Sequence, residues 1–149
     1  MSRILSIDFG HARIGLSISD PSKTIASPIE TVRGSKNPAQ AAQSVATELT
    51  SIIQRNQFDI DLIVVGLPLN LNGSESPRST ECRAFAQALE PLMGVKVELF
   101  DERMTSLQAD RSLKEANLSR KKRAGFVDTV SSTILLQCYL EFTKTKEPF

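Results

Sequence analysis

The stretch ILSIDFGHARIGLSIS, residues 4–19, sets the fold that we expect. A short, mostly apolar run ends at Asp8, and beyond Gly10 large apolar residues alternate with Gly and Ser over residues 14–19. Such alternation is typical of a strand that buries one face. The stretch therefore predicts a β-hairpin at the start of the chain.

The residues after the hairpin predict one more antiparallel strand and then alternating helices and strands. Residues 25–32 resemble a strand, but Pro28 cannot donate a ladder hydrogen bond, so we expect an edge strand or a bulge. Apolar spacing and capping residues predict six further elements in order: a helix at 38–57, a covered strand at 62–65, a helix opening at Ser76-Pro77, a strand at 95–101, and helices at 105–116 and 127–142. This order predicts one α/β domain over residues 1–149, with a mixed sheet and helices on its faces.

Composition excludes several classes of protein. The 149 residues are 40% hydrophobic with a formal charge of +1, so no overall charge favours nucleic acid, and any binding needs a local patch. Two cysteines and one histidine cannot assemble a tetrahedral zinc site. No stretch approaches the roughly 18 consecutive apolar residues of a membrane helix. We therefore expect a cytoplasmic protein with no membrane association.

The sequence carries no Walker loop, dinucleotide fingerprint or paired-histidine metalloprotease helix. Carboxylates remain as candidates for chemistry. Four of them stand at the ends of expected elements, where a side chain is presented rather than buried: Asp8, Asp101, Glu102 and Asp128. Magnesium and manganese prefer such hard oxygen ligands, and a carboxylate-held metal can activate water for phosphodiester cleavage. Together these acids predict a site for Mg²⁺ (or Mn²⁺).

Each acid also has a structural interpretation, which the sequence leaves open. Asp8 stands next to Gly10 and resembles an ordinary turn former. Asp101, Glu102 and Asp128 are each placed to cap the helix that follows, since carboxylates stabilise a helix N-terminus.

Nucleic acid contacts are expected from the hairpin loop and from two basic segments. Gly10 would let a phosphate approach the backbone, and Arg13 would supply charge. The full set of candidates is Gly10, Arg13, Arg103, Arg120, Lys121, Lys122 and Arg123. Arg103 could instead bridge Asp101, and residues 120–123 could be a solvated connecting loop. His11 is more typical of a turn than of a catalyst.

Several blocks of the chain, in order, closely resemble the YqgF (RuvX-like) family of Holliday junction resolvases and pre-16S rRNA nucleases. These blocks are IDFG at 7–10, RIG at 13–15, SD at 19–20, GLPLN at 66–70 with Gly73, DER at 101–103 with Thr105-Ser106, and Asp128 with ILLQCYL at 134–140. The resemblance implies an RNase H-like fold, a mixed five-stranded sheet with helices on both sides. It also implies a metal-dependent nuclease that matures the 5′ end of pre-16S rRNA or resolves branched DNA.

Carried over by position, the resemblance makes Asp8 the first-strand acid, Glu102 with Asp101 beside it the acid after the last strand, and Asp128 the acid of the C-terminal helix. Two departures matter. Ser131-Ser132 replace a pair of alanines, and Gly66 begins the segment where related resolvases place an acid after the central strand. The missing ligand must then come from Asp101 or Glu102.

The leading hypothesis is a Mg²⁺-dependent hydrolase that cleaves structured RNA, with pre-16S rRNA in ribosomal precursor particles as the expected partner and a monomer or weak homodimer as the expected state. One alternative is a resolvase of branched DNA, which would need a symmetric dimer. A second is a non-catalytic RNA- or ribosome-binding module. The related actin-like ATPases and sugar kinases need two such domains, and this chain supplies one.

Overall fold

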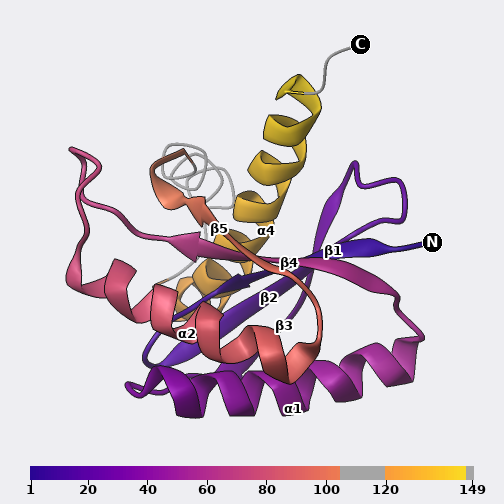
Figure 1. Ribbon diagram of the computed structural model, residues 1–149, viewed down its shortest axis with the longest axis horizontal. Coiled ribbons are helices and arrows are strands. Elements are labelled where there is room, and N and C mark those ends of the chain that lie inside the picture. Colours follow the sequence, from indigo (N-terminus) through magenta and orange to yellow (C-terminus); the bar gives the residue numbers. More distant parts are fainter. Residues whose placement is uncertain (105–119, 147–149) are drawn as a thin grey trace.

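The computed structural model describes residues 1–104 and 120–146, with the side chains of residues 1–103 and 131–144. Its sheet has five strands in the order β3-β2-β1-β4-β5 (Figure 1). The strands are β1 (Arg3–Asp8), β2 (Arg13–Ser19), β3 (Ala26–Arg33), β4 (Ile60–Leu67) and β5 (Val97–Asp101). The first three pair antiparallel, and β4 and β5 extend the sheet parallel to β1. The expected mixed sheet and the hairpin are confirmed.

Strand β3 shows both features expected from its proline. It lies at an edge of the sheet. Its register with β2 jumps from Glu30 opposite Leu16 to Pro28 opposite Ser17, so Ile29 is the extra residue of a bulge. A residue without an N–H group is tolerated at such a position because no ladder hydrogen bond is lost.

Helices α1 (Pro38–Asn56) and α2 (Pro77–Met93) begin where their capping residues predict. The Asn37 side chain accepts hydrogen bonds from the first turn of α1, and Ser76 forms a capping box with Ser79 at the start of α2. Both helices cover one face of the sheet and enclose the larger core (Figure 1). That core includes Phe85 and Leu89, which α2 presents from one side, as its spacing predicts.

Helix α4 (Arg120–Lys146) covers the opposite face and packs mainly on β1, β2 and β3. It begins at Arg120, so the interpretation of residues 120–123 as a connecting loop and the prediction of a helix starting at 127 are wrong. Residues 120–123 carry no apolar periodicity and resemble a solvated loop, but lysine and arginine are good helix formers and no proline interrupts them. The helix expected at 105–116 lies outside the described residues. No helix in the described part of the chain is long and apolar enough to span a membrane.

Candidate functional site

The carboxyl ends of three parallel strands meet at one edge of the sheet. Strand β1 ends at Asp8, β4 at Leu67 and β5 at Asp101, and β4 lies between the other two. The register sets Ile7 beside Val65 and Leu67 beside Asp101. Because parallel strands end together, the residues that follow them are brought close in space. Two of the sequence-predicted acidic segments therefore share this edge.

Strand alternation decides which side of the sheet each acid faces. Ser6 of β1 donates a hydrogen bond to α4, and Phe100 of β5 packs in the smaller core under α4. Asp8 lies two residues after Ser6, and Glu102 lies two residues after Phe100, so both acids are expected on the same side of the sheet as α4. Asp101 is expected on the opposite side. A hydrogen bond joins the carboxyl groups of Asp8 and Glu102. The structure thus brings Glu102, rather than Asp101, to Asp8.

Gly66 of β4 leaves the space that the Glu102 carboxyl group occupies. A Cβ atom built on Gly66 would overlap Glu102 Oε1 and lie 3.0 Å from Glu102 Cδ. Any other residue at position 66 would push this carboxyl group aside. At the end of the central strand, where related resolvases place an acid, Gly66 therefore leaves room for Glu102, which follows the neighbouring strand β5.

Burial raises the pKa of the Glu102 carboxyl group above its usual range. The hydrogen bond with Asp8 and the positive charge of Arg78 oppose this rise, and the charge of Asp101 adds to it. A second negative charge beside Asp8 is thus disfavoured without a cation. The donor set of two adjacent carboxyl groups suits Mg²⁺ or Mn²⁺. Among the described side chains, no cluster of three or more potential metal ligands is found.

Arg103 holds Asp101 away from this pair. Its Nη2 and Nε atoms donate to Asp101 Oδ2 at 2.6 and 2.8 Å, and its backbone N–H donates to Oδ1. Arg103 Nη1 also donates to the carbonyl oxygen of Leu71 at 3.2 Å. Hydrogen bonding to Arg103 lowers the pKa of Asp101. Arg103 therefore bridges Asp101, which is one of the two roles expected from the sequence. Its contact with nucleic acid stays a prediction.

The hairpin loop lines a cavity of about 470 Å³, and the residues around it are Asp8, Phe9, Gly10, His11, Ala12, Arg13 and Arg78. Arg78 was missed by sequence reasoning. Its Nη2 atom donates to the carbonyl oxygen of Phe9 at 2.7 Å, which ties the start of α2 to the loop. The Nε2 atom of His11 is in hydrogen-bond contact with the carboxyl group of Glu81 of α2. The one available signal for Arg78 was its position in the first turn of a well-capped helix.

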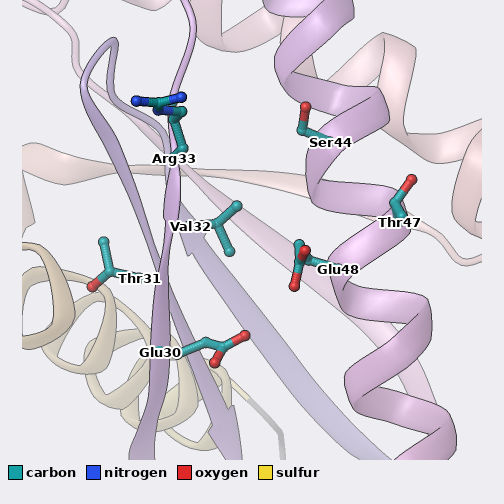
Figure 2. Close-up of a pocket in the computed structure, with 8 residues that line it drawn as sticks. Glu30, Thr31, Val32, Arg33, Ser44, Thr47 and Glu48 are labelled. Carbon is teal, nitrogen blue, oxygen red and sulfur yellow. The ribbon is translucent and has the colours of Figure 1, made fainter.

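A second pocket, of about 610 Å³, lies between β3 and α1 and contains none of the predicted acids. Figure 2 shows Glu30 and Glu48 extending into the gap between these two elements. Two carboxylates there would repel a phosphate group. This pocket therefore does not extend the acidic site.

The backbone of α4 fixes where position 128 lies, although the Asp128 side chain is outside the described side chains. Gln137 of α4 bonds the start of β3, and the carbonyl oxygen of Ser132 accepts from Ser6 Oγ at 2.8 Å. Helix α4 therefore runs antiparallel to β1. Position 128 lies one turn, about 6 Å, beyond Ser132 toward the Asp8 end of the sheet. Residues 120–123, whose side chains are also not described, form the first turn of the same helix.

Comparisons with known proteins give consistent results. A family model described as RuvX, Holliday junction resolvase, matches residues 2–142. A Protochlamydia amoebophila protein named "Putative pre-16S rRNA nuclease" is 44% identical over 140 residues, which span 94% of this chain and 93% of that protein. A Listeria monocytogenes protein of the same name is 36% identical over 141 residues, which span 95% of this chain and 99% of that protein.

Solved structures show the same fold at low sequence identity. The Thermus thermophilus RuvC in complex with a Holliday junction substrate matches with a TM-score of 0.59 and 11% identity, covering 97% of this chain and 96% of that one. A second structure of the T. thermophilus RuvC matches with a TM-score of 0.51. The expected RNase H-like α/β fold is confirmed.

Proposed function

The chain belongs to the RuvX family, and from this premise we propose that it is a divalent-metal-dependent nuclease that hydrolyses phosphodiester bonds of structured RNA. We take residues 1–149 as one nuclease domain and the cytoplasm as its compartment. The observation that carries the proposal is the meeting of Asp8 and Glu102, from strands on either side of β4. Two carboxyl groups in contact at a partly buried sheet edge repel each other when both are ionised, so the site favours the binding of a cation.

In this proposal Asp8 and Glu102 hold the metal, and Asp128 completes the site from α4. When bound, Mg²⁺ or Mn²⁺ would activate water and stabilise the leaving oxygen. Gly66 gives the Glu102 carboxyl group its place, and Arg103 keeps Asp101 apart from it. Arg78 fixes the Phe9 carbonyl group, so that the backbone at Gly10 and the Arg13 side chain can orient a substrate phosphate beside Asp8.

The substrate is proposed from the relatives. Several curated relatives carry pre-16S rRNA in their names, which favours ribosomal precursor RNA. The family description names Holliday junctions, which makes branched DNA the second candidate. A junction resolvase cuts two strands symmetrically and would need a dimer, whereas RNA end processing does not.

Purified protein incubated with precursor 16S rRNA and with a four-way DNA junction, each with Mg²⁺ or with chelator, tests the proposal. We expect Mg²⁺-dependent cleavage of the RNA. Asp8→Asn and Glu102→Gln should each abolish it, with a melting temperature unchanged or raised because a carboxylate repulsion is removed. The matched control is Glu48→Gln, an exposed acid on α1 that should cleave normally.

Other outcomes decide between the alternatives. Cleavage of the junction alone, by a dimer in sedimentation, would make the chain a DNA resolvase. RNA binding without cleavage under any metal condition would make it a binding module, and binding would then survive loss of Asp8. Full turnover by the Asp8→Asn variant would reduce Asp8 to a turn residue.

A further inference from the structure

The loop between β4 and α2 projects from the sheet next to the end of β5 (Figure 1). At its tip the side chain of Leu71 is 95% exposed. The neighbouring residues 70 and 72–75 are polar or glycine and are exposed as well. The other large exposed apolar side chains of the described chain lie on other segments: Met1, Ile25 and Leu92. The loop therefore presents one apolar side chain in a polar setting, and not a patch.

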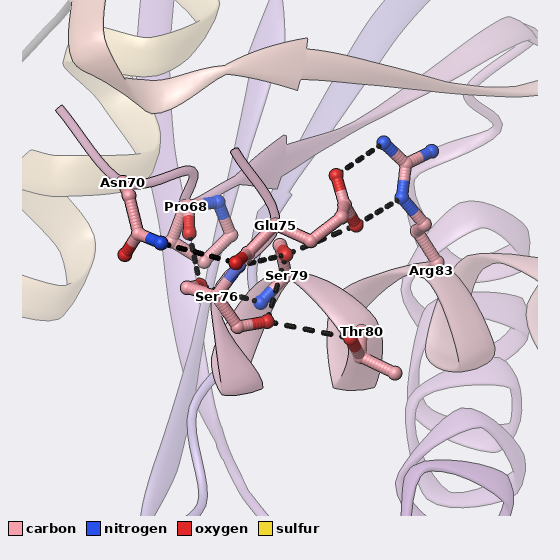
Figure 3. A network of polar contacts seen from close by, with 7 residues as sticks. All are labelled: Pro68, Asn70, Glu75, Ser76, Ser79, Thr80 and Arg83. Atoms are coloured by element: carbon pink, nitrogen blue, oxygen red, sulfur yellow. Dashed lines mark hydrogen bonds and ion pairs between the residues drawn. The ribbon is translucent and has the colours of Figure 1, made fainter. Parts of the chain in front are cut away.

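Hydrogen bonds make this loop rigid at its base. Figure 3 shows Asn70 bonded to the carbonyl oxygen of Glu75, and Ser76 bonded to that of Pro68. The Glu75 carboxylate accepts from Arg83 of α2 at 2.7 and 3.0 Å. The loop is thus anchored to the helix that follows it, and its exposed leucine is not the tip of a loosely held segment.

Arg103 connects the tip of this loop to Asp101 at the end of β5. Arg103 Nη1 donates to the carbonyl oxygen of Leu71, while the rest of the guanidinium group holds Asp101. At Gly73, where φ is +89°, a Cβ atom would lie 3.3 Å from the same Nη1 atom. Since Arg103 directly follows Glu102, the position of Leu71 is coupled through one side chain to the proposed metal site.

We propose that Leu71 is a wedge that enters between neighbouring bases of the nucleic acid beside the bond that is cleaved. This rests on the proposed function, because it is the acids at the same edge that place a nucleic acid here. Base faces are apolar and their edges polar, so a stack accepts one aliphatic side chain flanked by amide and hydroxyl groups. A protein partner would require a larger apolar patch. The wedge opens the helix and frees the backbone at the cleaved position.

A fluorescence measurement tests the wedge without requiring cleavage. An RNA helix carrying 2-aminopurine next to the cleavage position is titrated with protein in chelator. We expect the wild type to raise the fluorescence, since unstacking relieves quenching, and Leu71→Ala to lose most of that rise at saturation. Leu71→Phe should keep it. Leu92→Ala, which truncates a 48% exposed leucine on α2, is the matched control.

Cleavage kinetics give the second readout. On a fully paired helix, Leu71→Ala should lower kcat by about tenfold, because the enzyme must then open the stack without a wedge. On the same RNA with mismatches that already unpair the position, it should cleave within about twofold of the wild type. Thermal melting should be unchanged, because the side chain is exposed.

The failures are distinguishable. Equal fluorescence for the wild type and Leu71→Ala, or equal slowing on paired and mismatched RNA, overturns the wedge and leaves the nuclease intact. A loss of self-association in Leu71→Ala with normal unstacking overturns it in favour of a protein contact. Unstacking by the wild type that Leu71→Ala loses, with no cleavage of any substrate, keeps the wedge and refutes the nuclease. No binding to RNA or DNA refutes both.

Discussion

Gly66 has no side chain, and the Glu102 carboxyl group occupies the space that one would need. Replacing Gly66 with alanine puts a methyl group where Glu102 Oε1 now lies. The carboxyl group is the end of a flexible side chain, so it should move away from Asp8 at a cost of about 1 kcal/mol in stability. We predict that Gly66→Ala loses most Mg²⁺-dependent cleavage and the Mg²⁺-induced rise in melting temperature, while the fold persists.

A double-mutant cycle separates this effect from a general strand defect. In a Glu102→Ala background the overlapping atoms are gone, so Gly66→Ala should no longer lower the melting temperature. Should the alanine cost the same in both backgrounds, the loss comes from β4 itself and the positioning role of Gly66 is refuted.

At the scale of elements, the turn from β2 to β3 depends on one carboxylate. Asp20 Oδ1 accepts from the backbone N–H groups of Thr24 and Ile25 at 2.7 and 3.0 Å, and Ser22 donates to Oδ2. These bonds favour the ionised form and lower the pKa of Asp20 from 3.8 to about 2. The turn is therefore stabilised by a charged group that ordinary pH does not titrate.

Because the pKa of Asp20 is lower in the folded state, its contribution is complete above pH 3.8 and disappears as the pH falls through about 2. We predict that Asp20→Ala lowers the melting temperature at pH 7, and that the difference from the wild type shrinks below pH 4. Carbon-detected NMR of the Asp20 carboxyl group should titrate with a midpoint near pH 2. A midpoint near 3.8 would mean that the turn forms without the carboxylate.

Helix α4 approaches the sheet closely because small polar residues line the contact. Ser17 Oγ lies 2.6 Å from Ser132 Oγ and 2.8 Å from Thr133 Oγ1, and Ser132 is fully buried. The departure from alanine at Ser132 therefore keeps a small side chain and adds hydrogen bonds that its burial requires. The close contact sets the height of position 128 above the strand ends.

For the whole molecule, a net charge of +1 means that RNA affinity must come from local cations. The first turn of α4, residues 120–123, extends beyond the Asp8 end of the sheet. We predict that replacing Lys121 and Lys122 with alanine weakens binding to RNAs of different sequence alike. The slope of log affinity against log salt should fall by about 1 to 2, since each lost phosphate contact removes nearly one released counterion.

Stability should hardly change in that double variant, and the rate at saturating RNA should hold. The matched control replaces Lys36 and Lys96, which lie before α1 and before β5. If the salt slope is unchanged without Lys121 and Lys122, the RNA-facing cations have to be sought around Arg13 and Arg103.

Over the residues that the structure describes, the sequence by itself determined which helices and strands form and in what order. Alternation over residues 14–19 marked the hairpin, Pro28 marked an edge strand with a bulge, and Asn37 and Ser76 marked two helix starts. These features are local, because period, capping and the missing N–H of proline act within a few residues. The start of α4 was mistaken because residues 120–123 lack apolar periodicity, which is the signal that separates a helix from a loop.

Only the tertiary structure decided how the site is assembled. The sequence named both Asp101 and Glu102, and the choice between them follows from the register of β5 on β4 and from the empty space at Gly66. Arg78 and the exposed Leu71 gained meaning only from what they lie beside. Pairing between strands far apart in the chain fixes which side chains meet, and no local pattern in the sequence encodes that register.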